Sequence, residues 1–107
     1  MSGFKVNISN SKLSSFSLKN NPSLIGVDNP LPKVESRDFS NMFYNCRNLL
    51  TVPTNLFENN KSVTNMVNTF YYCYKLTTAP NIPNSVTDMR STFYSCTKLT
   101  TAPNIPN

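Results

Sequence analysis

The fold of this chain is decided by a stretch of sequence that occurs twice in its second half. Residues Thr69–Ser91 read TFYYCYKLTTAPNIPNSVTDMRS, and residues Thr92–Asn107 read TFYSCTKLTTAPNIPN, so the same text returns after 23 residues. An earlier copy over Met42–Asn68 reads MFYNCRNLLTVPTNLFENNKSVTNMVN and carries four extra residues around Phe57–Lys61. Self-similarity at a fixed period of this length is typical of repeat architectures. We therefore expect repeat units that pack side by side, with the insertion as a surface loop.

The copies share apolar residues at fixed positions, and these predict the core. Each unit holds too few apolar side chains for a core of its own, so it can bury them only against a neighbouring unit. A weaker copy lies upstream, with Asn21 at the cysteine position. In the three clearer copies a phenylalanine stands three residues before each cysteine and a leucine three residues after it. The predicted core residues are Phe43, Cys46, Leu49, Phe70, Cys73, Leu76, Phe93, Cys96 and Leu99.

The repeat unit resembles that of a known family. The pattern F-x-x-C-x-x-L-x-x-A-P-x-I-P-x-S-V-T-x-M is similar to the BspA-like leucine-rich repeat, close to the repeats of mycoplasma-type surface proteins. The resemblance covers about Leu13 to Asn107. It implies a leucine-rich-repeat fold and a role in adhesion or host-surface recognition, because BspA-like repeats are common in bacterial and protist surface proteins and occur in phage-encoded proteins.

The expected fold class is an α/β repeat, a leucine-rich-repeat solenoid with short parallel strands and short helical or 3-10 return segments. Leu76–Ala79 and Leu99–Ala102 are the predicted strands, which end at prolines because proline cannot donate to a strand ladder. Val86–Cys96 carries apolar residues at i, i+4 and i+7, which indicates a helical turn. We expect an N-terminal arm or cap over residues 1–12 and a solenoid over 13–107. Its units, about four in number and 23 to 27 residues long, are a degenerate capping repeat over 13–41, two full repeats over 42–68 and 69–91, and a partial one over 92–107.

The residue types present leave little chemistry for catalysis. The chain has 107 residues and no histidine, so the commonest general base and the commonest metal ligand are both missing. Its five acidic residues are scattered along the sequence. We expect a protein that is not an enzyme, with no catalytic residue and no cofactor.

The three cysteines lie too far apart in the sequence for a metal clip. Their spacings are 27 and 23 residues, whereas a zinc clip places its ligands roughly two to four residues apart. Their shared position in the repeat predicts buried, reduced thiols, and a disulfide between neighbouring units is the alternative. We expect no metal site.

Outward positions between the core residues are the expected binding surface. Tyrosine is enriched in protein interfaces, and Tyr44, Tyr71 and Tyr94 recur directly after the core phenylalanines, which predicts a half-exposed ladder. Ordinary half-buried surface tyrosines are the alternative. The predicted partner contacts are Tyr72, Tyr74, Lys75, Thr77, Thr78, Thr100 and Thr101.

Basic residues follow successive cysteines and predict a basic stripe. These residues are Arg47, Lys75 and Lys98, and the formal net charge of the chain is +5. Ten Lys and Arg residues are few for a nucleic-acid-binding protein of this length, and no arginine-rich run occurs. Binding of nucleic acid or another polyanion is therefore a weaker hypothesis than a solvated surface.

The leading functional hypothesis is a non-enzymatic protein–protein interaction or adhesion module with a protein or host-surface ligand. No apolar run approaches the roughly 20 residues of a membrane span, and the N-terminus does not read as a signal peptide. The compartment stays open, with a virion or a cell surface favoured. The first alternative is a structural component of a larger assembly, such as a phage virion or fibre, anchored by the N-terminal arm and contacting neighbouring subunits. The second is a basic polyanion binder.

Overall fold

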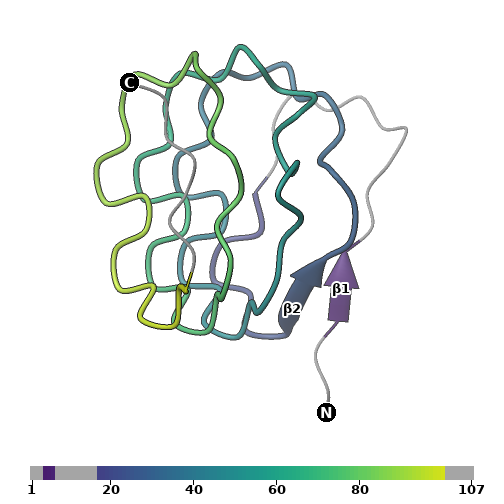
Figure 1. The fold of residues 1–107 in the computed structure, drawn as a ribbon, viewed down its shortest axis with the longest axis vertical. Helices are drawn as coiled ribbons and strands as arrows, with labels where there is room; N and C mark the ends of the chain where they lie inside the picture. Colours follow the sequence, from purple (N-terminus) through teal and green to yellow (C-terminus); the bar gives the residue numbers. More distant parts are fainter. Residues whose placement is uncertain (1–3, 7–16, 101–107) are drawn as a thin grey trace.

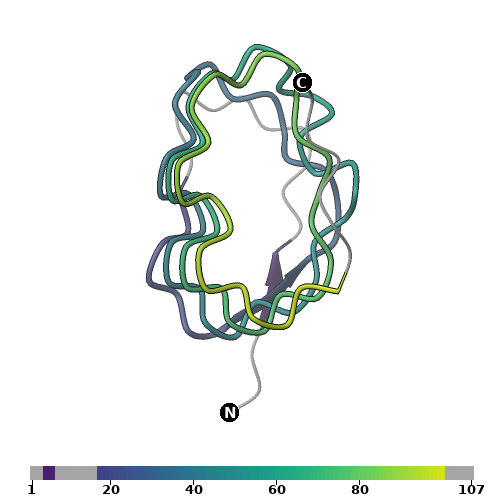
Figure 2. The same ribbon diagram turned by 60° about the vertical axis from the view of Figure 1, so that its left-hand side comes forward.

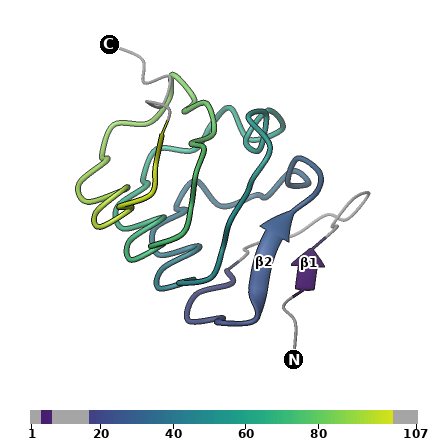
Figure 3. The ribbon, with the colours of Figure 1, turned by 60° about the horizontal axis from the view of Figure 1, so that its bottom comes forward.

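Successive repeat units lie side by side, in the order in which they occur in the sequence (Figure 1). The computed structural model describes residues 4–6 and 17–100. Viewed more nearly along the row of units, the units follow nearly the same path and overlay one another (Figure 2). A third view shows the same order of units (Figure 3). The molecule measures 36 × 30 × 20 Å along its principal axes.

Two short strands are the only strands among the described residues. β1 (Phe4–Val6) and β2 (Leu24–Val27) form a two-stranded parallel sheet, with Val6 opposite Val27. Three residues of the expected N-terminal arm are thus paired with the first repeat unit. The division of the chain into an arm and four repeats stays a prediction.

The expected α/β leucine-rich-repeat solenoid is wrong. The described part of the chain contains no helix, and outside β1 and β2 it forms turns, bends and isolated bridges. Leu76–Ala79 is not a strand, and Val86–Cys96 is a bridge residue followed by turns rather than a helical segment. Of the second predicted strand, Leu99–Ala102, only the first two residues lie within the described range.

Left-handed residues explain why the return segments are not helical. In the second, third and fourth units, the residue two before the shared phenylalanine and the residue just before the shared cysteine both have positive φ. A left-handed residue interrupts a right-handed helix, so the chain turns sharply twice instead of continuing. The residues with positive φ, which lies between 57° and 63°, are Asn20, Asn41, Asn45, Asn68, Tyr72, Ser91 and Ser95.

The segments after the shared leucines make too few main-chain hydrogen bonds to form strands. The amide of Thr77 donates to the carbonyl of Leu50 at 3.1 Å, and the amide of Thr100 donates to Thr77 at 3.0 Å. Pro80 and Pro83 then follow in the third unit and cannot donate. The predicted strand therefore stops at an isolated bond to the neighbouring unit.

Main-chain hydrogen bonds between the turns that carry the shared phenylalanines join each unit to the next. The amide of Phe43 donates to the carbonyl of Thr69, and the amide of Phe70 donates to the carbonyl of Thr92, both at 2.8 Å. Isolated parallel bridges also link Asp38 with Asn65 and Asn65 with Asp88. The units are therefore held in register although they lack regular secondary structure.

The core runs through the centre of the stacked units. In the second and third units the predicted core residues are fully buried, whereas Phe93, Cys96 and Leu99 of the fourth unit are only partly buried against the same cluster. The difference follows from position, because no described unit covers the far side of the fourth. The fully buried residues are Phe43, Cys46, Leu49, Phe70, Cys73 and Leu76.

Candidate partner-binding surface

All five tyrosines of the chain gather in one cluster, which we call the tyrosine surface. Each ring contacts at least one other, with centroid separations from 4.2 to 6.1 Å. The residues come from three successive units that the main-chain bonds hold side by side. They are Tyr44, Tyr71, Tyr72, Tyr74 and Tyr94.

Three of these rings form a stacked column across the units. Tyr44 and Tyr71 lie 5.1 Å apart with 12° between their planes, and Tyr71 and Tyr94 lie 4.8 Å apart with 20°. Each of these tyrosines directly follows a shared core phenylalanine, so the register of the core also sets the register of the column. Because the ring faces are turned toward one another, the column offers mainly ring edges and hydroxyl groups to a partner.

Tyr72 and Tyr74 form a second stacked pair beside the column. Their centroids are 5.5 Å apart with 15° between the planes, and Tyr72 also meets Tyr71 edge to face at 4.2 Å. Tyr74 is 40% exposed and Tyr94 is 53% exposed. The cluster is therefore anchored at Tyr71 and Tyr72 and open to solvent at Tyr74 and Tyr94.

Tyr72 takes a backbone conformation that is costly for a bulky side chain. Its φ is 63°, and the residues at the equivalent positions of the neighbouring units are Asn45 and Ser95. Asparagine tolerates left-handed geometry better than a bulky residue does. The turn imposes this conformation in the second, third and fourth units, and Tyr72 is the bulkiest residue that adopts it.

The hydroxyl group of Tyr71, in the middle of the column, stays protonated at neutral pH. A side-chain hydrogen bond with Tyr72, together with burial, raises the pKa of Tyr71 to about 12. The phenol of Tyr71 is thus a donor or acceptor rather than an anion across the physiological range.

Two of the four predicted threonine contacts, Thr77 and Thr100, already use their hydroxyl groups within the fold. The hydroxyl of Thr77 donates to the carbonyl of Leu50 at 3.2 Å, and that of Thr100 donates to the carbonyl of Thr77 at 2.9 Å. Thr78 is half-buried, and Thr101 lies outside the described residues. Thr77 and Thr100 therefore contribute more to joining the units than to a free hydrogen-bonding surface.

The three predicted basic residues are all exposed to solvent. Lys75 adjoins Tyr74 in the sequence, and Arg47 and Lys98 occupy nearby positions of the adjacent units. Arg90 forms an ion pair of 2.8 Å with Asp88, which lowers the pKa of Asp88 and raises that of Arg90. The surroundings of the tyrosines on these units thus include three exposed basic side chains, those of Arg47, Lys75 and Lys98.

The cysteines form a ladder of thiols that donate to main-chain carbonyls. The Sγ atoms of Cys46, Cys73 and Cys96 lie 3.1 to 3.2 Å from the carbonyl oxygens of Leu18, Phe43 and Phe70. All three are free thiols, and burial raises the pKa of Cys46 and of Cys96 to about 11. A protonated thiol is a poor nucleophile, so these groups serve packing.

Neither a metal-binding cluster nor a membrane-spanning helix occurs in the described ranges. Across residues 4–6 and 17–100, no three His, Cys, Asp or Glu side chains come together as metal ligands. The same ranges include no helix with the length and apolar character to cross a membrane.

Sequence reasoning missed how the tyrosines combine. Tyr72 and Tyr74 were predicted as contacts, whereas the column of Tyr44, Tyr71 and Tyr94 was predicted only as a ladder. The structure brings both groups into one surface.

A comparison of the chain with protein-family models, with curated proteins and with solved structures finds no match.

Proposed function

We propose that this protein is a non-enzymatic protein-binding module whose contact site is the tyrosine surface. The observation that carries the proposal is the concentration of all five tyrosines in one partly exposed cluster, with Tyr72 in a left-handed conformation. Tyrosines supply large, rigid contact area with a polar tip, which is why they dominate binding energy in many interfaces.

Ring geometry and charge favour an acidic protein surface as the partner. Stacked rings offer their electropositive edges and hydroxyl donors, and Lys75 lies beside Tyr74 in the sequence. Single-stranded nucleic acid needs free ring faces on which bases stack. The faces in the column are occupied by other tyrosines, so the column is a poor match for a nucleic-acid platform.

The other hypotheses from the sequence have less support. An anchoring N-terminal arm would have to leave the body of the protein, whereas β1 is paired with β2. The resemblance of the repeats to the BspA-like family stays a prediction, and the adhesion that it implies agrees with the present proposal.

The test uses substitutions borrowed from the neighbouring units. Asn45 of the second unit is equivalent to Tyr72, and Thr97 of the fourth unit is equivalent to Tyr74. The fold should therefore accept the substitutions Tyr72→Asn and Tyr74→Thr. Affinity capture from virion or host-surface proteins is carried out with the unchanged chain, with the double variant and with Leu50→Ala, which removes an unrelated side chain that is 48% exposed.

The expected result is a partner that the unchanged chain and Leu50→Ala retain and the double variant loses. Each tyrosine should contribute on the order of 1–2 kcal/mol to binding. Equal retention by all three proteins would overturn the proposal.

A further inference from the structure

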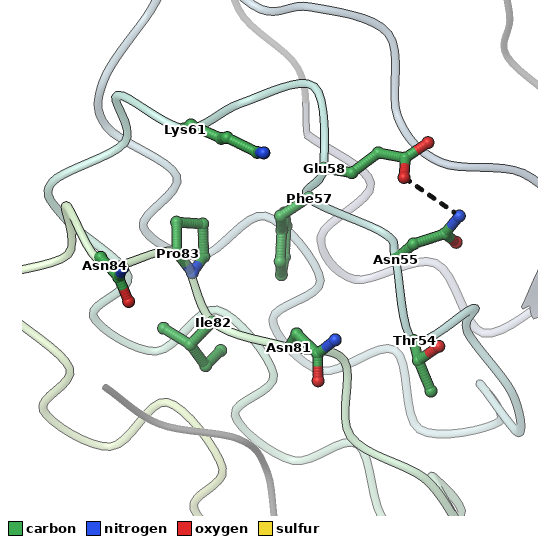
Figure 4. Close-up of a pocket in the computed structure, with 9 residues that line it drawn as sticks. All are labelled: Thr54, Asn55, Phe57, Glu58, Lys61, Asn81, Ile82, Pro83 and Asn84. Carbon is green, nitrogen blue, oxygen red and sulfur yellow. Dashed lines mark hydrogen bonds between the residues drawn. The ribbon is translucent and has the colours of Figure 1, made fainter. Parts of the chain in front are cut away.

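The four-residue insertion of the second unit leaves a pocket beside the third unit. The cavity measures about 570 Å³, which lies within the range of small-ligand sites. Figure 4 shows residues of the inserted loop on one side and Asn81, Ile82, Pro83 and Asn84 of the third unit on the other. None of these residues belongs to the tyrosine surface.

The loop is fixed to the unit before it, which explains why the pocket opens toward the unit after it. Asn60 is buried, and its side chain accepts from the amide of Val34 at 2.7 Å and donates to the carbonyl of Pro32 at 3.1 Å. The side chain of Asn59 donates to the carbonyl of Leu31 at 3.0 Å. The pocket wall is therefore held in place without a ligand.

Among the described residues, the hydrogen bonds between this loop and the following unit lie at the two ends of the loop. The amide of Asn81 donates to the carbonyl of Thr54 at 2.9 Å, and the hydroxyl of Ser85 donates to the carbonyl of Val63 at 2.5 Å. Between these points the longer loop diverges from the shorter third unit. The pocket is the space that the mismatch in length creates.

The lining combines an apolar base with a polar rim. Phe57 and Ile82 are almost fully buried and Pro83 is half-buried, so their surfaces close the pocket from below. The side chains of Asn81 and Asn84 are exposed, and within the described residues neither side-chain amide makes a hydrogen bond. Asn55 donates to the Glu58 carboxylate at 3.3 Å (Figure 4).

The rim carries one charge of each sign, from Glu58 and Lys61, and therefore gives no net preference to an anion or a cation. A hydroxyl group both donates and accepts, so it can bind an amide, a carboxylate or an ammonium group equally well. A sugar ring carries several hydroxyl groups on its rim and C–H groups on its face, which matches a polar rim above an apolar base.

We propose that this pocket binds a neutral saccharide unit, with Asn81, Asn84, Glu58 and Lys61 contacting its hydroxyl groups. The sugar would lie over Ile82 and Pro83. This site is separate from the tyrosine surface and does not depend on the function proposed for it.

The test is an amide NMR titration of the full chain with four neutral sugars, namely glucose, galactose, mannose and N-acetylglucosamine. Each is added up to about 10 mM, because single sugars in an open pocket are expected to bind in the millimolar range. At least one sugar should shift the amides around Asn81–Asn84 and Glu58–Lys61. The double variant Asn81→Ala/Asn84→Ala should weaken that binding about tenfold or more, and Tyr72→Asn/Tyr74→Thr should leave it unchanged.

Three results would overturn the proposal. The first is the absence of shifts with all four sugars, and the second is shifts that map away from the pocket or persist in the double asparagine variant. The third is a stronger response to inorganic phosphate than to any sugar, which would make the pocket an anion site centred on Lys61. Both asparagines are exposed at the side chain, so the variant is expected to fold, and its amide spectrum verifies this.

Discussion

The phenyl rings of Phe43 and Phe70 lie parallel, with their centroids 5.2 Å apart and 5° between their planes. Phe93 continues the stack at 5.5 Å and 3° from Phe70. Parallel rings at the same position of successive units show that the repeat in the sequence is also a repeat in space. The buried phenylalanine column therefore places the tyrosine column that follows it by one residue.

The middle ring of this stack should matter most for stability. Phe70→Ala removes a fully buried ring that packs on both faces, which should lower the free energy of unfolding by about 3–5 kcal/mol. Phe93→Ala removes a half-buried ring and should cost about 1–2 kcal/mol. Urea denaturation of both variants measures the difference, and equal losses would contradict the stacked core.

Stability should fall at alkaline pH because of the buried thiols. Burial raises the pKa of Cys46 and Cys96 to about 11 and raises that of Cys73 as well. In the unfolded chain a thiol titrates near pH 8.5, so above roughly that pH the unfolded chain has lost protons that the folded protein keeps. Raising the pH then favours unfolding, and the contribution is fully present only below about pH 8.

Denaturation curves at several pH values between about 7 and 11 check this expectation. Cys73→Ala removes the most deeply buried of the three thiols and should make the decline with pH shallower. A decline of the same steepness in that variant would show that other groups cause it.

The left-handed conformation of Tyr72 can be tested apart from binding. Tyr72→Asn and Tyr72→Ala both remove the ring, but asparagine tolerates a φ of 63° better than alanine does. The asparagine variant should therefore be more stable than the alanine variant by about 1 kcal/mol. Thermal unfolding compares the two, and an alanine variant of equal or greater stability would count against the strained backbone.

The inserted loop should depend on one buried amide. Asn60→Ala leaves the amide of Val34 and the carbonyl of Pro32 without their partner, which should cost about 1–3 kcal/mol. Asn59→Ala removes an exposed side chain with one hydrogen bond and should cost about 0.5–1 kcal/mol. If chemical denaturation ranks the two variants the other way round, the loop is anchored differently.

The sequence predicted where the core lies better than how the backbone runs. The spacing of the sequence repeat alone placed Phe43 and Phe70 at equivalent positions, because burial against a neighbouring unit requires the same side chain in each unit. The helix expected over Val86–Cys96 failed because Ser91 and Ser95 adopt left-handed φ, which serine rarely does and which no spacing rule detects. The available signal was asparagine at the equivalent positions of the earlier units, namely Asn41, Asn45 and Asn68.

The candidate sites, too, could be predicted from the sequence only in part. The tyrosine column could be anticipated from Tyr44, Tyr71 and Tyr94, whereas the meeting of Tyr72 with Tyr71 depends on the sharp turn between them. The sequence indicated the pocket only through the extra residues around Phe57–Lys61. They predicted a surface loop but did not predict that this loop lines a pocket.

Fluorine NMR of the protein labelled with 3-fluorotyrosine tests the binding role of the tyrosine surface most directly. All five labels fall on this surface, so each resonance reports on it. Titration with the captured partner should shift the resonances of Tyr74 and Tyr94, the two most exposed rings, together with that of Tyr72. Saturable binding that leaves all five resonances unchanged would contradict the proposal, because the partner would then bind elsewhere on the molecule.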